Sequence, residues 1–136
     1  MTASLRIAVA DDEPDIRDYF NKCLPRMGHQ VVGMAQNGRE LVEKCRAALP
    51  DLVITDIKMP DMDGISAAVQ IYQERPVPVI LVSAYHDEAS NDRADAGHIL
   101  GYLVKPIQQA DLEPAIDLAM CRFGQLQTAA QPSAPD

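Results

Sequence analysis

Short runs of apolar residues recur along the chain, and each is bounded by polar or turn-forming residues. Unbroken apolar runs of roughly four to eight residues are typical of strands that are buried on both faces of a sheet. The pattern predicts strands at Leu5–Ala10, Val31–Ala35, Leu52–Thr55, Val79–Val82 and Gly101–Val104.

The segments between these runs carry apolar residues at helical spacing. In the first segment Pro14 falls in the opening turn, where a missing N–H is tolerated. Pro25 should distort or end that helix, and Gly28 closes the segment. The next helix is expected to open at Asn37-Gly38 and to stop at Pro50.

Three further helices are expected. Asp63 is a suitable N-cap for the third, and a weakly apolar segment from about Asp87 to Ala96 is interpreted as the fourth. Asp111 is expected to cap the last helix. Because strands alternate with helices throughout, the fold class is α/β, with a parallel sheet covered on both faces.

Length and composition indicate a single domain. The 136 residues suffice for one core, here residues 1–127, and residues 128–136 are expected to be a disordered tail or the start of a linker. The net charge of −8 argues against direct nucleic-acid binding. Cys23, Cys45 and Cys121 are interpreted as reduced, partly buried thiols. With no signal-like or membrane-spanning segment, we expect a cytoplasmic protein.

Polar residues suited to phosphate chemistry follow four of the predicted strands. Asp11 and Asp12 follow the first, Asp56 the third, Ser83 the fourth and Lys105 the fifth. In a parallel sheet the carboxyl ends of the strands meet at one edge, where ligands bind. The sequence therefore predicts one shared site.

The predicted site suits Mg²⁺, which takes carboxylates, waters and a phosphate oxygen as ligands. A dication would relieve the repulsion among Asp11, Asp12 and Asp56. Asp56 could then attack a phosphoryl group and form an acyl phosphate. Lys105 would pair with the phosphoryl oxygens, and the Ser83 hydroxyl would donate a hydrogen bond to one of them.

Over residues 5–127 the chain resembles receiver domains of two-component response regulators. The matching stretches, in order, are Val9-Ala10-Asp11-Asp12-Glu13, Asp56-Ile57-Lys58-Met59-Pro60-Asp61-Met62-Asp63-Gly64, Ser83-Ala84 and Tyr102-Leu103-Val104-Lys105-Pro106. Each stretch alone is a modest signal, but all of them in this order are very specific. The resemblance implies a flavodoxin-like fold with strand order 2-1-3-4-5.

The resemblance also implies roles for single residues. Asp56 would accept phosphate from a sensor histidine kinase or a phosphotransfer protein. Asp11 and Asp12 would hold Mg²⁺ together with the backbone carbonyl of Lys58. Ser83, Tyr102 and Lys105 would sense the phosphate. The face formed by the fourth helix, the fifth strand and the last helix would then change and control a downstream target, an output domain or a second copy in a phosphorylation-dependent homodimer.

Each residue also has a purely structural interpretation. Asp11 and Asp12 could cap the first helix, Ser83 could bond to backbone, and Lys105 could be a solvated surface lysine. Capping does not require the distant partners, so the combination favours the functional interpretation. Pro106 adds to it, because a cis Lys-Pro bond could aim the lysine inward.

Rival functions fit the residues less well. A phosphohydrolase of the haloacid-dehalogenase type needs an acidic residue two positions after the nucleophile, where this chain has Lys58. A flavodoxin-like nucleotide or flavin carrier needs a phosphate-cradling loop after the first strand, where Asp12-Glu13-Pro14-Asp15 would repel phosphate. A degenerate receiver that only docks to partners would not need the complete acidic set.

The sequence does not name the kinase, the stimulus or the downstream target. The chain could be a complete single-domain regulator or the isolated receiver of a longer transcription regulator. Segments such as Gly101–Ile107 and Asp111–Ile116 resemble receivers of ANTAR-type antitermination regulators. Gly97 and Tyr102 are separated by one residue more than is common in the family, so the loop near the fourth helix is expected to differ in shape.

Overall fold

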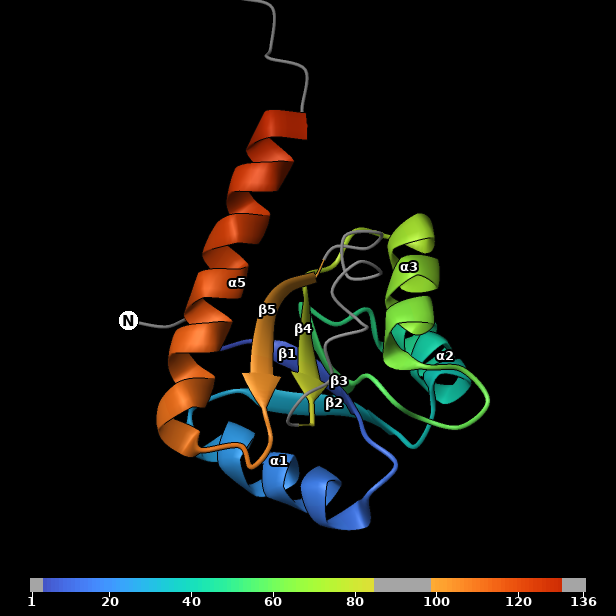
Figure 1. The fold of residues 1–136 in the computed structure, drawn as a ribbon. Helices are drawn as coiled ribbons and strands as arrows, with labels where there is room; N and C mark the ends of the chain where they lie inside the picture. The colour runs from blue at the N-terminus through green and yellow to red at the C-terminus, as the bar shows by residue number, and fades with distance from the viewer. Residues whose placement is uncertain (1–3, 85–98, 131–136) are drawn as a thin grey trace, which may run out of the picture.

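In the computed structural model, which describes residues 4–84 and 99–130, the strands form one parallel sheet. Across the sheet the order is β2-β1-β3-β4-β5, as predicted (Figure 1). The strands are β1 (Arg6–Ala10), β2 (Gln30–Ala35), β3 (Leu52–Asp56), β4 (Val79–Ser83) and β5 (Ile99–Val104). The predicted α/β fold class and strand order are thus confirmed.

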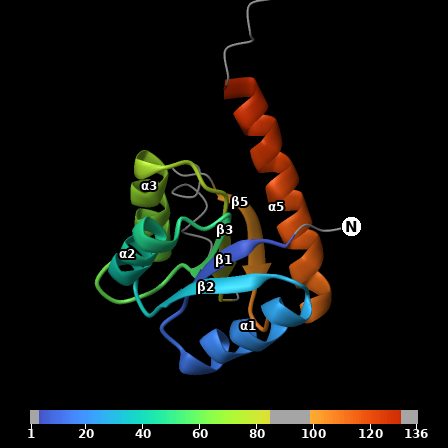
Figure 2. The same cartoon turned by 180° about the vertical axis from the view of Figure 1, so that it is seen from behind.

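Helices cover both faces of the sheet. They are α1 (Pro14–Arg26), α2 (Gly38–Ala48), α3 (Gly64–Glu74) and α5 (Gln109–Ala130). Figures 1 and 2 show α1 and α5 on one face and α2 and α3 on the other. The helix expected from about residue 87 to residue 96 lies outside the described residues.

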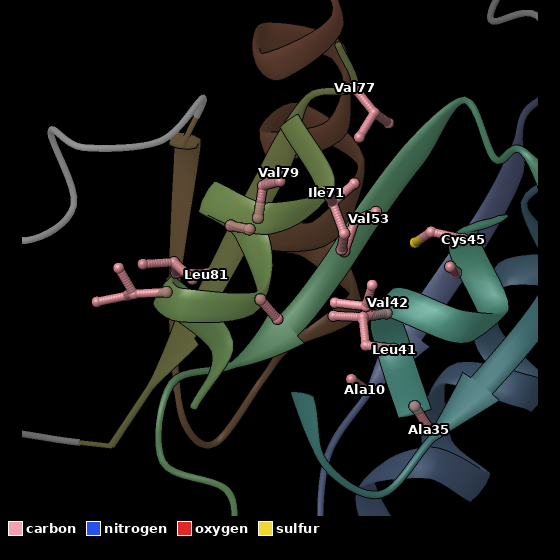
Figure 3. Packing of buried hydrophobic residues seen from close by; sticks show 14 of the residues in the cluster. Ala10, Ala35, Leu41, Val42, Cys45, Val53, Ile71, Val77, Val79 and Leu81 are labelled. Carbon is pink, nitrogen blue, oxygen red and sulfur yellow. The ribbon is translucent and has the colours of Figure 1, made fainter. Parts of the chain in front are cut away.

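Successive strand residues enter two separate cores, as the period of a strand requires. Ile7 and Val9 of β1 pack with α1 and α5, whereas Ala8 and Ala10 pack with α2 and α3. Figure 3 shows part of the second core, including Val53 from the central strand. Because β1 and β3 are buried on both faces, the residues that follow them are held rigidly.

Local signals in the sequence are borne out at the helix ends. The Asn37 side chain accepts a hydrogen bond of 2.8 Å from the Glu40 N–H, and the Asp63 side chain accepts one of 2.7 Å from the Ser66 N–H. Helix α1 ends one residue after Pro25, and Gly28 follows with a φ of 91°. The Asn37 and Asp63 side chains thereby satisfy N–H groups that the first turn of a helix leaves without partners.

The last helix differs from its prediction at both ends. It begins at Gln109, so Asp111 lies in the first turn and is not the cap. The Asp111 N–H already donates to the Gln108 carbonyl, and its carboxylate remains favourable near the positive end of the helix. At the other end α5 runs to Ala130, past residue 127, because good helix formers continue until Pro132 approaches.

The cysteines agree with the prediction only in part. All three cysteines are free; Cys23 and Cys45 are buried, but Cys121 is exposed, contrary to the expectation that each is partly buried. Within residues 4–84 and 99–130, no helix has the length and apolar character needed to cross a membrane.

Candidate functional site

Strand register brings the predicted polar residues to one edge of the sheet. Ala10 of β1 pairs with Thr55 of β3, so Asp11 and Asp56 lie at the same level. Asp56 pairs in turn with Val82 of β4, one residue before Ser83. Ser83 pairs with Val104, and the Lys105 N–H donates to the Ser83 carbonyl at 2.9 Å.

Three carboxylates converge there. Asp11, Asp12 and Asp56 each offer one oxygen, and these oxygens all lie within 4.8 Å of one another. Asp11 is fully buried and Asp56 is 7% exposed, whereas Asp12 is exposed at the mouth. Such a set of oxygen ligands, partly open to water, is what Mg²⁺ requires.

The hydrogen bonds of the carboxylates support this match. Asp11 Oδ1 accepts from the Glu13 N–H at 2.9 Å, and Asp56 Oδ1 accepts from the Ile57 N–H at 2.9 Å. Asp11 Oδ2 is buried and has no hydrogen-bond partner among the described residues. A buried oxygen without a hydrogen bond is rare and calls for an explanation, and a hard cation would supply one.

Lys105 is the cation that faces the carboxylates. Its Nζ lies 3.3 Å from Asp56 Oδ2, as a hydrogen bond, and 3.3 Å from Asp11 Oδ2, as an ion pair whose geometry is not that of a hydrogen bond. Glu13 Oε1 is 3.8 Å from the same nitrogen. The Lys105–Pro106 peptide bond is cis, as the sequence suggested.

Electrostatics show that one lysine does not neutralise this pocket. Burial, followed by the charge of Asp11, raises the pKa of Asp56 to about 6, although Lys105 acts in the opposite direction. Burial also raises the pKa of Asp11. Burial disfavours the charged form of Lys105, but the two carboxylates outweigh it and raise the pKa of that amine. The pocket therefore has room for more positive charge.

Glycines set the backbone around Asp56. A Cβ on Gly64 would overlap the Asp56 carbonyl oxygen, and the Gly64 N–H donates to the Ile57 carbonyl at 2.8 Å. A Cβ on Gly38 would likewise overlap the Met62 carbonyl oxygen, to which the Gly38 N–H donates at 2.8 Å. The first turns of α2 and α3 are thereby fixed to the loop that follows Asp56.

Two residues of this site were not singled out from the sequence. Arg17 Nη1 donates to the Asp11 carbonyl at 2.7 Å, and Glu13 contacts Lys105 as described above. Arg17 lies in α1, one helical turn after the N-cap residue Glu13. This spacing was the sequence signal that could have placed Arg17 beside the acidic pair. Both residues orient the groups that surround Asp56.

Three further predicted residues lie at or after the strand ends that carry this centre, or on a neighbouring strand. Ser83 ends β4 and is partly buried. Tyr102 lies on β5, at the edge of the sheet, with 49% of its surface exposed. Lys58 follows β3 by two positions and its side chain is exposed. The structure thus brings Asp11, Asp12, Asp56 and Lys105 into mutual contact or near contact, with Ser83 beside them.

A doubly wound sheet with an acidic cluster and a lysine at its carboxyl edge is the arrangement expected of a signalling receiver. Comparison with known proteins agrees: the model of the response regulator receiver domain matches residues 7–117. The chain therefore belongs to the response regulator receiver domain family of two-component systems. Receivers are signalling modules that bind Mg²⁺ at an acidic pocket, and the cluster described above corresponds to that pocket.

Individual relatives give the same result. The transcriptional regulatory protein PdtaR of Mycobacterium tuberculosis is 40% identical over 121 residues, which span 89% of this chain and 59% of that protein. The chain thus covers less than two thirds of this relative. The chemotaxis protein CheY of Thermotoga maritima is 34% identical, over 82% of this chain and 94% of its own length. A solved response regulator receiver domain from Clostridium thermocellum matches with a TM-score of 0.79 and 30% identity, over 89% of this chain and 98% of its own.

Proposed function

We propose that this receiver is a switch in which Asp56 accepts a phosphoryl group from a histidine kinase or a phosphotransfer protein. The observation that supports it best is the position of the Asp56 carboxylate, 3.3 Å from Lys105 Nζ and within the cluster that Asp11 and Asp12 complete. Asp56 is the member of that cluster nearest the ends of both β3 and β4.

Each residue of the site has a separate role in the phosphoryl transfer. An Asp56 oxygen attacks phosphorus, the P–N bond of the phosphohistidine breaks as the P–O bond forms, and the imidazole nitrogen takes up a proton. Asp11, Asp12, Asp56 and the Lys58 carbonyl would hold Mg²⁺, which supplies positive charge to the transferred phosphoryl oxygens. Lys105 pairs with one of these oxygens and Ser83 donates to another. Water attack on phosphorus later restores the Asp56 carboxylate.

The signal then leaves the pocket through the strand ends. A phosphoryl group adds about −1.5 to −2 charges, which a bistable element must convert into a new surface. Ser83 hydrogen-bonds through its backbone to Lys105, and Tyr102 lies three residues before Lys105 on the exposed edge strand. We propose that the face predicted from the fourth helix, β5 and α5 changes and binds a target, an output domain or a second copy; the predicted fourth helix lies outside the described residues.

A direct test is phosphorylation by acetyl phosphate with MgCl₂, followed by intact-mass measurement. We expect a mass increase of one phosphate that hydroxylamine removes, and no increase in Asp56→Asn. Asp61→Asn is the matched control, because Asp61 is an exposed acid on the same loop and should leave labelling intact. A label of equal extent in Asp56→Asn, mapped by fragmentation away from the pocket, would refute the assignment.

The similarity to a transcriptional regulator supports a second proposal about context. We infer that the receiver controls gene expression through an output region that this sequence does not contain, as an antitermination regulator would. The 40% identical relative is named as a transcriptional regulator and is longer than the matched segment. Fusing the receiver to the output region of a regulator of that kind, and measuring reporter expression with and without Asp56→Asn, tests this context.

A further inference from the structure

A cavity of about 230 Å³ lies between α2 and α3, away from the carboxylates. Its residues come from the middle and end of α2, from the last turn of α3 and from the chain that follows each helix. Because each helix runs back across the sheet, these residues lie at the amino edge, opposite Asp56. The lining residues are Val42, Cys45, Arg46, Leu49, Ile71, Glu74, Arg75 and Val77.

The volume restricts what can enter. Cavities of roughly 150 Å³ hold a benzene ring, whereas pockets for drug-sized ligands span roughly 300–1,000 Å³. At about 230 Å³ the cavity fits one aromatic ring with a short chain, or a short alkyl chain alone.

The floor of the cavity is apolar. Val42, Ile71 and Val77 are at most 4% exposed, and Figure 3 shows them around the space between the two helices together with Cys45. Burial raises the pKa of the Cys45 thiol to about 12, so this group is neutral at physiological pH. A hydrocarbon group would therefore be favoured there over a charged one.

The mouth carries one positive charge in excess. Arg46 and Glu74 form a bidentate ion pair, with contacts of 2.7 and 2.6 Å, and neutralise each other. Arg75 instead donates from Nη1 to the neutral Pro50 carbonyl at 3.1 Å, so this contact leaves its charge uncompensated. Although the chain as a whole carries a net charge of −8, the local positive charge of Arg75 would favour an anion at the mouth.

Leu49 supplies an independent observation at the same mouth. It is 52% exposed and adopts a left-handed φ of 51° at the end of α2, where glycine would be the unstrained choice. Exposure and conformation both disfavour leucine, and the core does not require it. Such local strain is typical of functional positions, and here the side chain adds apolar surface to the cavity.

We propose that the cavity between α2 and α3 binds a small amphipathic carboxylate, with its ring or alkyl chain on the apolar floor and its carboxylate at Arg75. A planar guanidinium is well suited to a carboxylate because it offers parallel N–H donors. The site is separate from the phosphorylation pocket and does not depend on the proposed transfer.

The test is a methyl NMR titration of the wild-type protein with 4-phenylbutyrate and, in parallel, with the neutral 4-phenylbutan-1-ol. We expect shifts at Val42, Ile71 and Val77, a dissociation constant on the order of 0.1–1 mM for the carboxylate, and binding of the alcohol that is roughly tenfold weaker. Arg75→Gln should weaken the carboxylate roughly tenfold and leave the alcohol unchanged. Arg39→Gln is the control, because it removes the same charge from an exposed residue in the first turn of α2 that does not line the cavity, and it should leave the affinity for the carboxylate unchanged.

Three outcomes would overturn the proposal. One is the absence of a charge effect, seen either as equal affinity for both probes or as carboxylate binding that Arg75→Gln leaves unchanged. Another is the absence of shifts at Val42, Ile71 and Val77 up to about 10 mM probe, well above the affinity expected for a ligand of this size. The third is a set of shifts at these methyl groups that depends on protein concentration without any probe, which would mean that the face around Leu49 joins two copies.

Discussion

The two edges of the sheet hold polar groups in opposite ways. At the carboxyl edge, buried Asp11 and Asp56 share Lys105, and burial raises the pKa of both carboxyl groups although Lys105 acts in the opposite direction. At the amino edge, Cys45 is neutral and Arg46 is paired within the molecule. The carboxyl edge therefore holds more carboxylates than its one lysine balances, whereas the amino edge keeps the positive charge of Arg75, which its hydrogen bond to the neutral Pro50 carbonyl does not balance.

The buried carboxylates make the carboxyl edge the part of the fold where burial of charge lowers stability. Buried carboxylates with raised pKa values lower the stability of the metal-free protein at neutral pH, since unfolding returns them to water. Apolar packing of both cores must offset that loss.

The largest effect is expected where backbone approaches backbone at the carboxyl edge. In Gly64→Ala the new methyl group would collide with the Asp56 carbonyl, which no rotamer can avoid. We expect a loss of about 3 kcal/mol or more in the free energy of unfolding, measured in urea. Gly124→Ala in α5 is the control: with no atom within 4 Å of the new Cβ, it should stabilise by up to about 1 kcal/mol. Equal effects of the two changes would contradict the close approach.

A pH titration of stability measures the charge at the carboxyl edge. The pKa of Asp56 is about 6 in the folded protein and near 3.8 when unfolded, so the folded state binds the proton more tightly. Stability without metal should thus rise as pH falls from 7 toward 4. The shift sets an upper bound of about 3 kcal/mol, and because the pocket opens to water at Asp12 we expect roughly 1–2 kcal/mol.

Asp56→Asn is the matched change for that titration. It should stabilise the metal-free protein at pH 7 by a similar amount and flatten the pH dependence, because an amide has no proton to exchange in this range. A variant less stable than wild type at pH 7, with an unchanged slope, would mean that Lys105 already compensates Asp56 fully.

Much of this contrast follows from the sequence, for physical reasons. Parallel strands end at one edge of the sheet, so the residues that follow β1 and β3 come together there, and the observed pairing of Ala10 with Thr55 places Asp11 beside Asp56. Local capping by Asn37 and Asp63 was equally readable, because the side chain and its N–H partner lie three residues apart.

Other features depend on contacts that no local pattern encodes. The cavity at the amino edge arises from how α2 and α3 pack against each other, and the left-handed Leu49 carries no glycine signal. Arg17 reaches the Asp11 carbonyl only because α1 begins directly after the acidic pair. The start of α5 at Gln109 was missed because Asp111 is favourable in a first turn as well as at a cap.

Magnesium should reduce the contrast between the edges. Added at tenfold above its dissociation constant, it should stabilise the protein by about 1.4 kcal/mol, seen as a rise in the melting temperature. The double variant Asp11→Asn, Asp12→Asn should not respond, and NaCl at equal ionic strength controls for screening. The same rise in wild type and in the double variant would place the cation elsewhere.

The smallest effect is expected at the amino edge, and only at alkaline pH. Because the pKa of the Cys45 thiol rises from 9.0 to about 12 on folding, the folded protein keeps a proton that the unfolded chain loses above pH 9. Ionisation of the thiol therefore has no influence on stability at pH 7, and it lowers stability by about 1 kcal/mol near pH 10. Comparing the urea midpoints of wild type and Cys45→Ala between pH 7 and pH 10 isolates this slope from the other groups that titrate there. If the difference between the two proteins stays constant over that range, the thiol of the folded protein ionises as readily as in water, and the amino edge is more open than the cavity described here.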